Sequence, residues 1–384
     1  MKINILILLI ITVICKTNYS QSYPAFGPQI KVTVTGLTFD AMEPAISADG
    51  NYIFFNNLND GITTSLYYAT KINDSTFTYT GPLTGANQTI TPRLDAVASS
   101  DSANNFFWTS TRDFPTQFDN FHHGIFNGNN IVNIGRLHGS FYIYSPGWIM
   151  MDAAINYRGD MLYYTNAYFG PSYAECNGAP CDAKLGVAQK QNDSTFNKLS
   201  NSDSIMQNIN DTNYIVYAPH ITKDGLELYF TRILKNTVNT EICVSVRNNL
   251  SAYFSLPYIV YSNNGFVPEA ATLSSDKQKM YYHQKDGTGV FKIYMRYRYS
   301  STGIDETNTK MGIKLFPNPS SAILNVFIPN PNDKYDIEIY TMLGQQIFKT
   351  STTTIIDIGN FEKGIYMLTV KQKDKTVSTK IIKQ

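Results

Sequence analysis

The sequence has little charge and no excess of either sign. Only 16% of its 384 residues are charged, and 31 Lys and Arg residues nearly balance 30 Asp and Glu residues. A disordered chain would carry more charge and fewer aromatic residues than the 13% found here. A net charge of +1 also argues against a protein that binds nucleic acid through a strong positive field. The composition therefore indicates a folded, neutral chain that does not bind nucleic acid.

Long hydrophobic runs are absent as well. The clearest apolar run, Ile5–Cys15, has about eleven residues and is interrupted by Thr12, whereas a membrane-spanning helix needs about twenty. This run follows the basic Lys2 and is typical of a secretory signal that ends at Ser20. We therefore predict a signal peptide over residues 1–20 and no transmembrane segment after its removal. A buried N-terminal strand is the alternative.

Cysteine is scarce, and export would change how the four cysteines are interpreted. Cys176 and Cys181 flank a short stretch that contains Gly and Pro, and an oxidising compartment favours a disulfide between them. Two free thiols are the alternative. A zinc site would need a second pair of ligands at suitable spacing, which the sequence lacks, so we predict no metal site and no cofactor. Cys243 fits a small hydrophobic residue in a strand.

The sequence is rich in aromatic residues, with 27 Tyr and 22 Phe, which favours strands over helices. An apolar strand, a polar turn and an aromatic strand recur five times between residues 21 and 300. The turn positions are Asp49, Asp101, Arg158, Asp224 and Asp276, at spacings of 52, 57, 66 and 52 residues. Asp-Gly at two of these positions predicts two-residue hairpin turns, in which a positive φ is required.

Each repeat has room for about four strands, which is the size of a propeller blade. One blade cannot bury its own apolar faces, so stacking of blades explains the repetition. The fifth repeat lacks a fourth strand, which residues 29–35 could supply to close the ring. We therefore predict an all-β protein with a five-bladed β-propeller over residues 21–300. Six blades or a repetitive β-sandwich are the alternatives.

Two of the repeats carry a recognisable motif. Pro44 and Ser47 precede Asp49-Gly50, and Pro219 and Thr222 precede Asp224-Gly225 at the same spacing. This pattern resembles the PD40, or TolB-type, WD40-like β-propeller repeat. The resemblance implies the fold but says little about function, because propellers have many functions.

The composition changes after a polar linker at residues 301–310. Alternating apolar and polar residues, separated by turns with Pro and Gly, predict a small antiparallel β-sandwich over residues 311–384. Its separated motif residues are Pro317, Asn318, Pro319, Gly344, Gly364, Tyr366, Lys380 and Lys383. Their order resembles the type A C-terminal sorting domain of the type IX secretion system. The resemblance implies that the type IX machinery is a partner, and that the protein is secreted or lies at the outer-membrane surface of a Gram-negative bacterium.

Long loops are expected on one face of the propeller. We call this the long-loop face, and its longest segments are residues 112–120, 138–148, 167–181 and 200–213. Eight aromatic residues in these segments are candidate stacking platforms for a sugar or a peptide: Phe114, Phe118, Tyr142, Tyr144, Trp148, Tyr168, Phe169 and Tyr173. The alternative is that these rings only pack the loops against the blades.

Acidic residues recur at the start of the innermost strands. Glu43, Asp95 and Asp152 each precede their turn residue by six positions, and Glu269 lies within one position of the same register. We expect them to ring the channel mouth on the long-loop face. A pair of carboxylates can act as acid and base on a glycosidic bond, as in five-bladed glycosidases. A hydrated or cation-binding acidic mouth is the alternative.

The sequence therefore predicts a secreted or surface-displayed propeller that binds a glycan or a protein on its long-loop face and is not an enzyme. Two alternatives remain: a glycoside hydrolase that uses the channel-mouth carboxylates, and a structural or assembly protein of the cell envelope.

Overall fold

The computed structural model describes residues 23–173, 175–176, 179–299, 313–328, 334–373 and 375–384. The predicted signal peptide at residues 1–20 and the predicted linker at residues 301–310 lie outside these ranges. Nearly all regular structure in the described residues is β-strand, and the one helix, α1, spans only Ser202–Ile205. The all-β prediction is confirmed.

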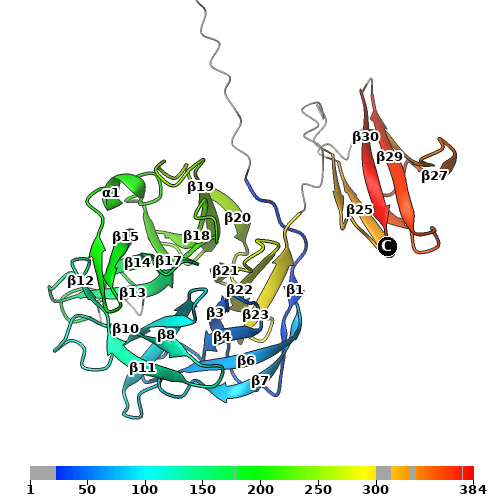
Figure 1. Ribbon diagram of the computed structural model, residues 1–384. Helices are drawn as coiled ribbons and strands as arrows, with labels where there is room; N and C mark the ends of the chain where they lie inside the picture. The colour runs from blue at the N-terminus through cyan, green and yellow to red at the C-terminus, as the bar shows by residue number, and fades with distance from the viewer. Residues whose placement is uncertain (1–22, 174, 177–178, 300–312, 329–333, 374) are drawn as a thin grey trace, which may run out of the picture.

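Five sheets form five blades around a central axis (Figure 1). In each blade the strands follow one another outward from the axis, and the innermost strands of successive blades contact each other around the whole ring. Blade 1 contains β3 (Met42–Ile46), β4 (Tyr52–Asn56), β6 (Leu66–Asn73) and β7 (Thr76–Pro82). Blade 2 contains β8 (Arg93–Ser100), β9 (Asn105–Ser110), β10 (Phe121–Phe126) and β11 (Ile131–Arg136).

The remaining blades follow the same order. Blade 3 contains β13 (Trp148–Ile155), β14 (Met161–Tyr168), β15 (Asp182–Asn192) and β16 (Thr195–Lys198). Blade 4 contains β17 (Tyr214–Ile221), β18 (Glu227–Leu234), β19 (Thr240–Val246) and β20 (Tyr258–Ser262). Blade 5 contains β21 (Glu269–Leu273), β22 (Lys279–Lys285), β23 (Phe291–Tyr297) and β1 (Ile30–Lys31). Short strands β5 (Thr63–Thr64) and β12 (His138–Gly139) extend the sheets of blades 2 and 3.

The N-terminal segment closes the ring, as the sequence predicts. Ile30 pairs antiparallel with Met295 of β23, so β1 completes blade 5. The chain then passes Val32, whose amide donates to the Ile293 carbonyl at 2.9 Å, into β2 (Thr33–Thr35). Strand β2 pairs in parallel with β7 of blade 1. Residues 30–35 therefore join the last blade to the first, rather than forming one strand of blade 5 alone.

The hairpin turns between the first two strands differ from the predicted two-residue type. The Ser47 amide donates to the Tyr52 carbonyl at 3.0 Å, which leaves four residues in the loop. The Asp49 carboxylate accepts from the Ser47 hydroxyl at 2.6 Å and from the Asn51 amide at 3.0 Å. Gly50 supplies the left-handed φ of +76°. Asp-Gly therefore fixes this turn through the carboxylate as well as through the glycine.

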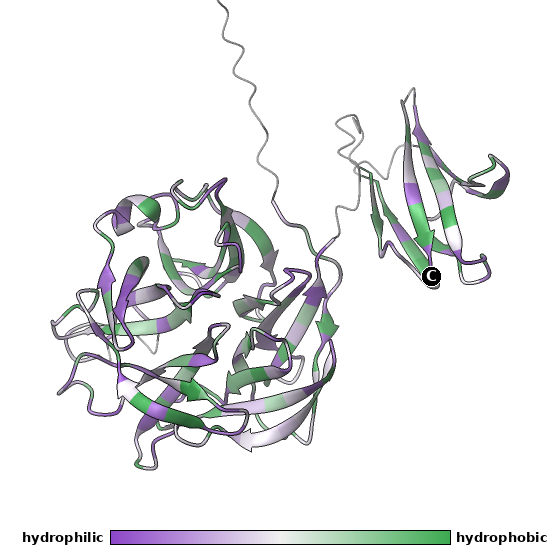
Figure 2. Cartoon of the chain, in the orientation of Figure 1, coloured by the Kyte–Doolittle hydropathy of each residue, from purple (hydrophilic) through white to green (hydrophobic). Residues whose placement is uncertain are grey.

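Aromatic residues of the blade strands pack across the interfaces between blades. Phe54 of blade 1 packs edge-to-face on Phe106 of blade 2, with ring centroids 5.0 Å apart. Between blades 5 and 1, Phe77 packs against Tyr281 in the same way at 6.2 Å. Burying each such ring contributes about 1.5–3 kcal/mol, so each interface stabilises two blades at once. Hydrophobic residues recur along the blade strands in Figure 2.

The C-terminal segment forms two small sheets. The first contains β24 (Lys314–Phe316), β25 (Ile323–Phe327) and β28 (Ile355–Asp357). The second contains β26 (Tyr335–Thr341), β27 (Gln346–Thr350), β29 (Gly364–Gln372) and β30 (Lys375–Lys383). Leu324 and Ile356 of the first sheet share one buried cluster with Ile337 and Leu368 of the second. This is the predicted antiparallel sandwich.

Candidate functional site

Every innermost strand contains one bulge that shapes the channel. The bulged residue takes a left-handed φ of 52–58° in each blade: Glu43, Val97, Asp152, Ala218 and Ala270. A non-glycine residue rarely adopts this conformation, and a bulge turns the local side chain away from the regular sheet direction. The recurrence in all five blades identifies the bulge as part of the propeller architecture.

The bulges also tie neighbouring blades together. The Glu43 amide donates to Nδ1 of His283 in blade 5 at 2.9 Å. The Ala270 amide donates to the Thr231 hydroxyl of blade 4 at 3.0 Å. In each case a side chain from the preceding blade satisfies a backbone amide that the bulge has removed from the sheet.

The positions of the bulges show that the acidic residues do not all share the one register that the sequence predicted. Glu43 and Asp152 are bulge residues, Glu269 precedes its bulge residue by one position, and Asp95 precedes Val97 by two. The amide of Asp101 donates to the Asn105 carbonyl, so Asp101 occupies the place of Ser47 in blade 1 rather than that of Asp49. The Ser47 position is two residues before that of Asp49, so the alignment through Asp101 was wrong by two residues.

Asp95 consequently has a different environment from the other acids. Its carboxylate is fully buried and lies 3.0 Å from Nη2 of Arg112. It also accepts from the Gln88 amide at 2.8 Å. These contacts make Asp95 an anchor for the loops of blade 2.

Glu43, Asp152 and Glu269 form an acid cluster near the bulges. The Tyr217 hydroxyl donates to Oε1 of Glu269 at 2.6 Å, and Nε2 of His283 lies 3.4 Å from Oε2 of Glu269. Oδ2 of Asp152 accepts from the amide of a blade 4 residue, Ala218, at 2.9 Å. The cluster therefore contains groups from blades 1, 3, 4 and 5.

The cluster shifts the acidity of its members. Burial, together with the charges of Asp152 and Glu269, raises the pKa of the Glu43 carboxyl to about 8. Burial raises the pKa of Asp152 to about 6. Oε1 of Glu43 accepts from the Asn59 amide at 3.0 Å, whereas Oε2 has no partner among the described residues. At pH 7 Glu43 is therefore mostly protonated and Asp152 mostly ionised.

The cavity that Glu43 lines is small. Its volume is ≈ 60 Å³, and alanines from several innermost strands, including Ala45, Ala98 and Ala154, narrow it. Pockets that hold organic ligands have about 300–1,000 Å³, so this cavity has room for ordered water rather than for a sugar ring. In the part of the chain that the structure describes, no group of three or more His, Cys, Asp or Glu residues could hold a metal ion.

Four of the predicted aromatic residues meet in what we call the aromatic cluster: Phe114, Phe118, Tyr144 and Tyr173. Phe118 packs edge-to-face on Phe114 and on Tyr144, with centroid distances of 5.9 and 6.1 Å. Tyr173 packs on Phe114 at 5.2 Å. These rings come from three separate loops, and the Tyr144 side chain is 63% exposed. The cluster is therefore an accessible aromatic surface on a rigid scaffold.

Polar groups border the aromatic cluster. Oδ1 of Asp119 accepts from the Tyr144 hydroxyl at 2.7 Å, and Oδ2 lies 2.7 Å from Nδ1 of His138. Nη1 of Arg136 donates to the Asp119 carbonyl at 2.7 Å. The sequence did not identify Asp119 or His138 as site residues, because an isolated polar residue in a loop or in a two-residue strand gives no periodic signal.

The other four predicted aromatic residues have different surroundings. Tyr142 is buried and donates to the Leu137 carbonyl at 2.6 Å. Trp148 packs on Tyr168 at 5.1 Å, and Phe169 packs against a buried cluster in blades 3 and 4. For Tyr142 and Phe169 the packing alternative fits better than a binding role.

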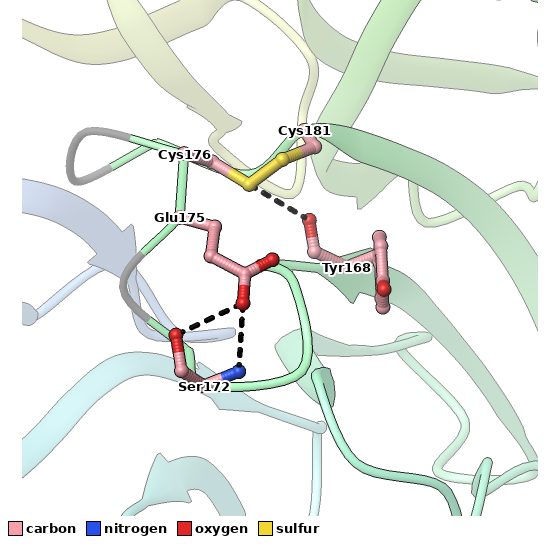
Figure 3. The surroundings of a disulfide bond; sticks show 5 residues. All are labelled: Tyr168, Ser172, Glu175, Cys176 and Cys181. Atoms are coloured by element: carbon pink, nitrogen blue, oxygen red, sulfur yellow. Dashed lines mark hydrogen bonds between the residues drawn. A yellow bond between two sulfur atoms is a disulfide. The ribbon is translucent and has the colours of Figure 1, made fainter.

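The predicted disulfide between Cys176 and Cys181 is present and closes a short loop beside Tyr168 (Figure 3). Just before this loop, the Glu175 carboxylate accepts from the amide and hydroxyl of Ser172 at 3.3 and 3.1 Å. The Cys181 amide donates to the Tyr168 carbonyl at 2.7 Å. The bond from Cys181 fixes the end of the loop against β14, which ends at Tyr168. Cys243 is buried and free, as predicted.

Several buried polar atoms in loops and strands of blades 2 and 3 lack partners. Among the described residues, Nε2 of Gln88, Oδ1 of Asn166 and the Tyr173 hydroxyl have no hydrogen bond. Buried polar atoms in folded proteins nearly always have a protein or water partner. These atoms are therefore available to ordered water or to a ligand.

The C-terminal motif residues stabilise the small sandwich. Asn318 bridges to the last strand, because its amide donates to the Lys380 carbonyl at 2.6 Å and its oxygen accepts from the Ile382 amide at 2.7 Å. Lys383 is buried at the end of the last strand: Nζ donates to the Ser321 carbonyl at 2.7 Å, and the residue is 8% exposed. Pro317, Pro319, Gly344, Gly364 and Tyr366 lie at turns and strand ends of the same domain.

Residues 314–384 match the family described as "Secretion system C-terminal sorting domain". This segment is a type IX sorting domain. Proteins that carry it are secreted or held at the cell surface, and so is this one. No curated protein sequence gives a significant match to the chain. Within the described residues, no helix has the length and apolarity needed to cross a membrane.

Solved structures resemble the propeller at low identity. TolB from Acinetobacter baumannii is 11% identical, with 69% of this chain and 55% of that chain covered and a TM-score of 0.37. This chain thus spans about half the length of that protein. The GH43 endo-arabinanase from Bacillus licheniformis is 12% identical, with 71% and 98% covered and a TM-score of 0.45. The endo-arabinase from Bacteroides thetaiotaomicron gives the same values.

Proposed function

We propose that this protein is exported by the type IX machinery to the outer surface of a Gram-negative cell or to the medium, and that its propeller binds a glycan without cleaving it. The observation that carries the proposal is the aromatic cluster, in which three loops hold four aromatic rings beside polar groups. Long loops on a rigid scaffold are where binding residues concentrate. The disulfide and the Asp119 contacts hold these loops in place before a ligand arrives, which lowers the entropic cost of binding.

A sugar suits this surface chemically. Sugar rings have an apolar face that stacks on aromatic rings, and hydroxyl groups at their edges that need hydrogen-bond partners. Phe118 and Tyr144 provide aromatic rings for stacking. Asp119 and His138 provide polar groups beside these rings, since the Asp119 carboxylate lies 2.7 Å from both the Tyr144 hydroxyl and Nδ1 of His138. A protein ligand is the alternative occupant and is an outcome of the test below.

Binding without cleavage fits the position of the acids. The cavity lined by Glu43 has a volume of ≈ 60 Å³, which excludes a sugar ring. Asp95 is paired with Arg112 and lies outside the acid cluster. One observation favours hydrolysis as a second candidate: a carboxyl with a pKa of about 8, as at Glu43, is protonated at neutral pH and suits a general acid.

A glycan array probed with the full secreted chain, with product analysis by mass spectrometry, tests the proposal. We expect saturable binding that falls roughly tenfold in Tyr144→Ala, because a stacked ring contributes about 1.5 kcal/mol. Tyr253→Ala is the matched control, since Tyr253 is 53% exposed and lies outside the aromatic cluster. Equal loss in both variants, or no glycan bound while an envelope protein is captured, would contradict glycan binding. Release of shortened glycans that Glu43→Gln abolishes would favour the hydrolase.

A further inference from the structure

A second, larger cavity lies between blades 3 and 4. Its volume is ≈ 340 Å³, within the range of ligand pockets. The turns at residues 156–161 and 223–225, which join the first two strands of these blades, form part of its wall. Strand β14 runs from Met161 at this cavity to Tyr168 near the disulfide loop. Eight extended residues span about 25 Å, so the cavity and the aromatic cluster are separate sites.

The cavity has an aliphatic wall. It consists of Met161, Val187, Leu199, Ile205 and Ile221, and no aromatic ring except that of Tyr163 lines the cavity among the described residues. Val187 and Ile205 belong to the buried cluster between blades 3 and 4. A sugar would find few stacking partners here, whereas a hydrocarbon chain would bury apolar surface against this wall.

One end of the cavity carries a buried cation. The Arg247 residue is 9% exposed, and its guanidinium donates to the carbonyls of Gly225 and Leu250 at 2.8 and 3.1 Å and to the Tyr163 hydroxyl at 3.3 Å. It also lies over the Phe254 ring, 4.5 Å from the centroid. All of these partners are neutral, and no described carboxylate forms an ion pair with Arg247. A buried charge without a counter-ion is costly for a folded protein.

The other charged groups at the cavity leave this cation uncompensated. Lys223 lies over the Tyr157 ring at 4.3 Å and also has no ion pair among the described residues. The Asp224 carboxylate is held by Lys277 at 2.6 Å. Asp160 is 3.6 Å from the Arg158 guanidinium. Both acids of the lining therefore already have cationic partners, and positive charge remains in excess.

We propose that this cavity binds a small amphiphilic carboxylate, with its hydrocarbon chain on the aliphatic wall and its carboxylate near Arg247 and Lys223. The charged end supplies the counter-ion that Arg247 lacks, in a charge-assisted hydrogen bond. The size of the cavity limits the ligand to a short or medium chain. This site is independent of the proposed glycan site.

Isothermal titration of the full secreted chain with hexanoate, hexanamide and hexylammonium tests the proposal. We expect saturable binding of hexanoate, at least tenfold weaker binding of hexanamide, and none of hexylammonium. Equal affinity for hexanoate and hexanamide would overturn the charge assignment, and the absence of saturable hexanoate binding would overturn the site.

Three variants locate the binding. Lys223→Gln should weaken hexanoate binding about fivefold, and Leu250→Trp, at a rim residue that is 49% exposed, should block the cavity. Arg247→Gln should abolish the preference for hexanoate over hexanamide. If Arg247→Gln fails to fold, Lys223→Gln and Leu250→Trp still show whether hexanoate binds in this cavity. Lys184→Gln is the matched control, because Lys184 lies on β15 but not in the cavity lining. Unchanged binding in Lys223→Gln and Leu250→Trp would place the ligand elsewhere and refute the proposal.

Discussion

The acid cluster makes the stability of the propeller depend on pH in a way that one substitution should remove. Glu43 has a folded-state pKa of about 8, against an ordinary value of 4.5, because it is buried and faces Asp152 and Glu269. The folded protein therefore holds this proton more tightly than the unfolded chain does. The stability contributed by Glu43 is complete below pH 4.5 and is lost as the pH rises through about 8.

The size of the effect follows from the shift. A rise from 4.5 to about 8 corresponds to about 5 kcal/mol when each pKa unit is worth about 1.4 kcal/mol. Glu43 remains partly accessible from the channel, and water entry reduces this figure. We therefore expect the wild type to lose about 2–5 kcal/mol relative to Glu43→Gln between pH 4.5 and pH 9. Gln has the same shape and keeps an oxygen for the Asn59 amide.

Urea denaturation of both proteins at several pH values from 4.5 to 9 measures this difference. The measured quantity is the difference in stability between wild type and Glu43→Gln at each pH. Burial lowers the pKa of His122 to about 3 and that of His220 to about 4, but both histidines are present in both proteins and affect them equally. Asp203→Asn is the control, since the Asp203 side chain is 84% exposed. Stability curves for wild type and Glu43→Gln that run parallel across this pH range would show that the pKa of Glu43 is not raised in the folded protein.

Three further predictions concern the ring, the disulfide and export. Val32→Ala should lower the free energy of unfolding by about 1–2 kcal/mol in urea denaturation, because Val32 is 5% exposed between blades 5 and 1. The control Val238→Ala should leave the free energy of unfolding unchanged, because Val238 is 80% exposed. Replacing Cys176 and Cys181 with Ser should cost about 2 kcal/mol in thermal unfolding, as expected for a short closed loop, and a melting temperature equal to that of the wild type would contradict this. Deletion of residues 311–384 should leave the protein inside the cell in a fractionation assay, and continued secretion would contradict the sorting assignment.

The sequence predicted the propeller well because its signals are local and repeated. An aromatic strand after a polar turn recurs every 52–66 residues, and this period is visible without any knowledge of contacts. Ring closure was also predictable, since the fifth repeat lacked a strand and residues 29–35 alternate in a strand-like pattern. The disulfide followed from its short spacing and from export.

The sites were harder to predict because they depend on register and on contacts between distant residues. Asp101 stands at the start of its turn, where blade 1 has Ser47, so an alignment that relies on Asp placed Asp95 two positions from its true register. Val97 occupies the bulge position in blade 2, although a β-branched residue rarely adopts a positive φ. The cavity at Arg247 joins segments from residue 156 to residue 250, so no local pattern identifies it.

Hydrogen–deuterium exchange of the full secreted chain, with and without the glycan selected on the array, shows where on the propeller the glycan binds. Glycan binding on the aromatic cluster predicts slower exchange at residues 111–120 and 138–147, and unchanged exchange at the turns 156–161 and 223–225. Protection of those turns with none at the aromatic cluster, or no protection at saturating glycan, would show that the aromatic cluster does not bind the glycan.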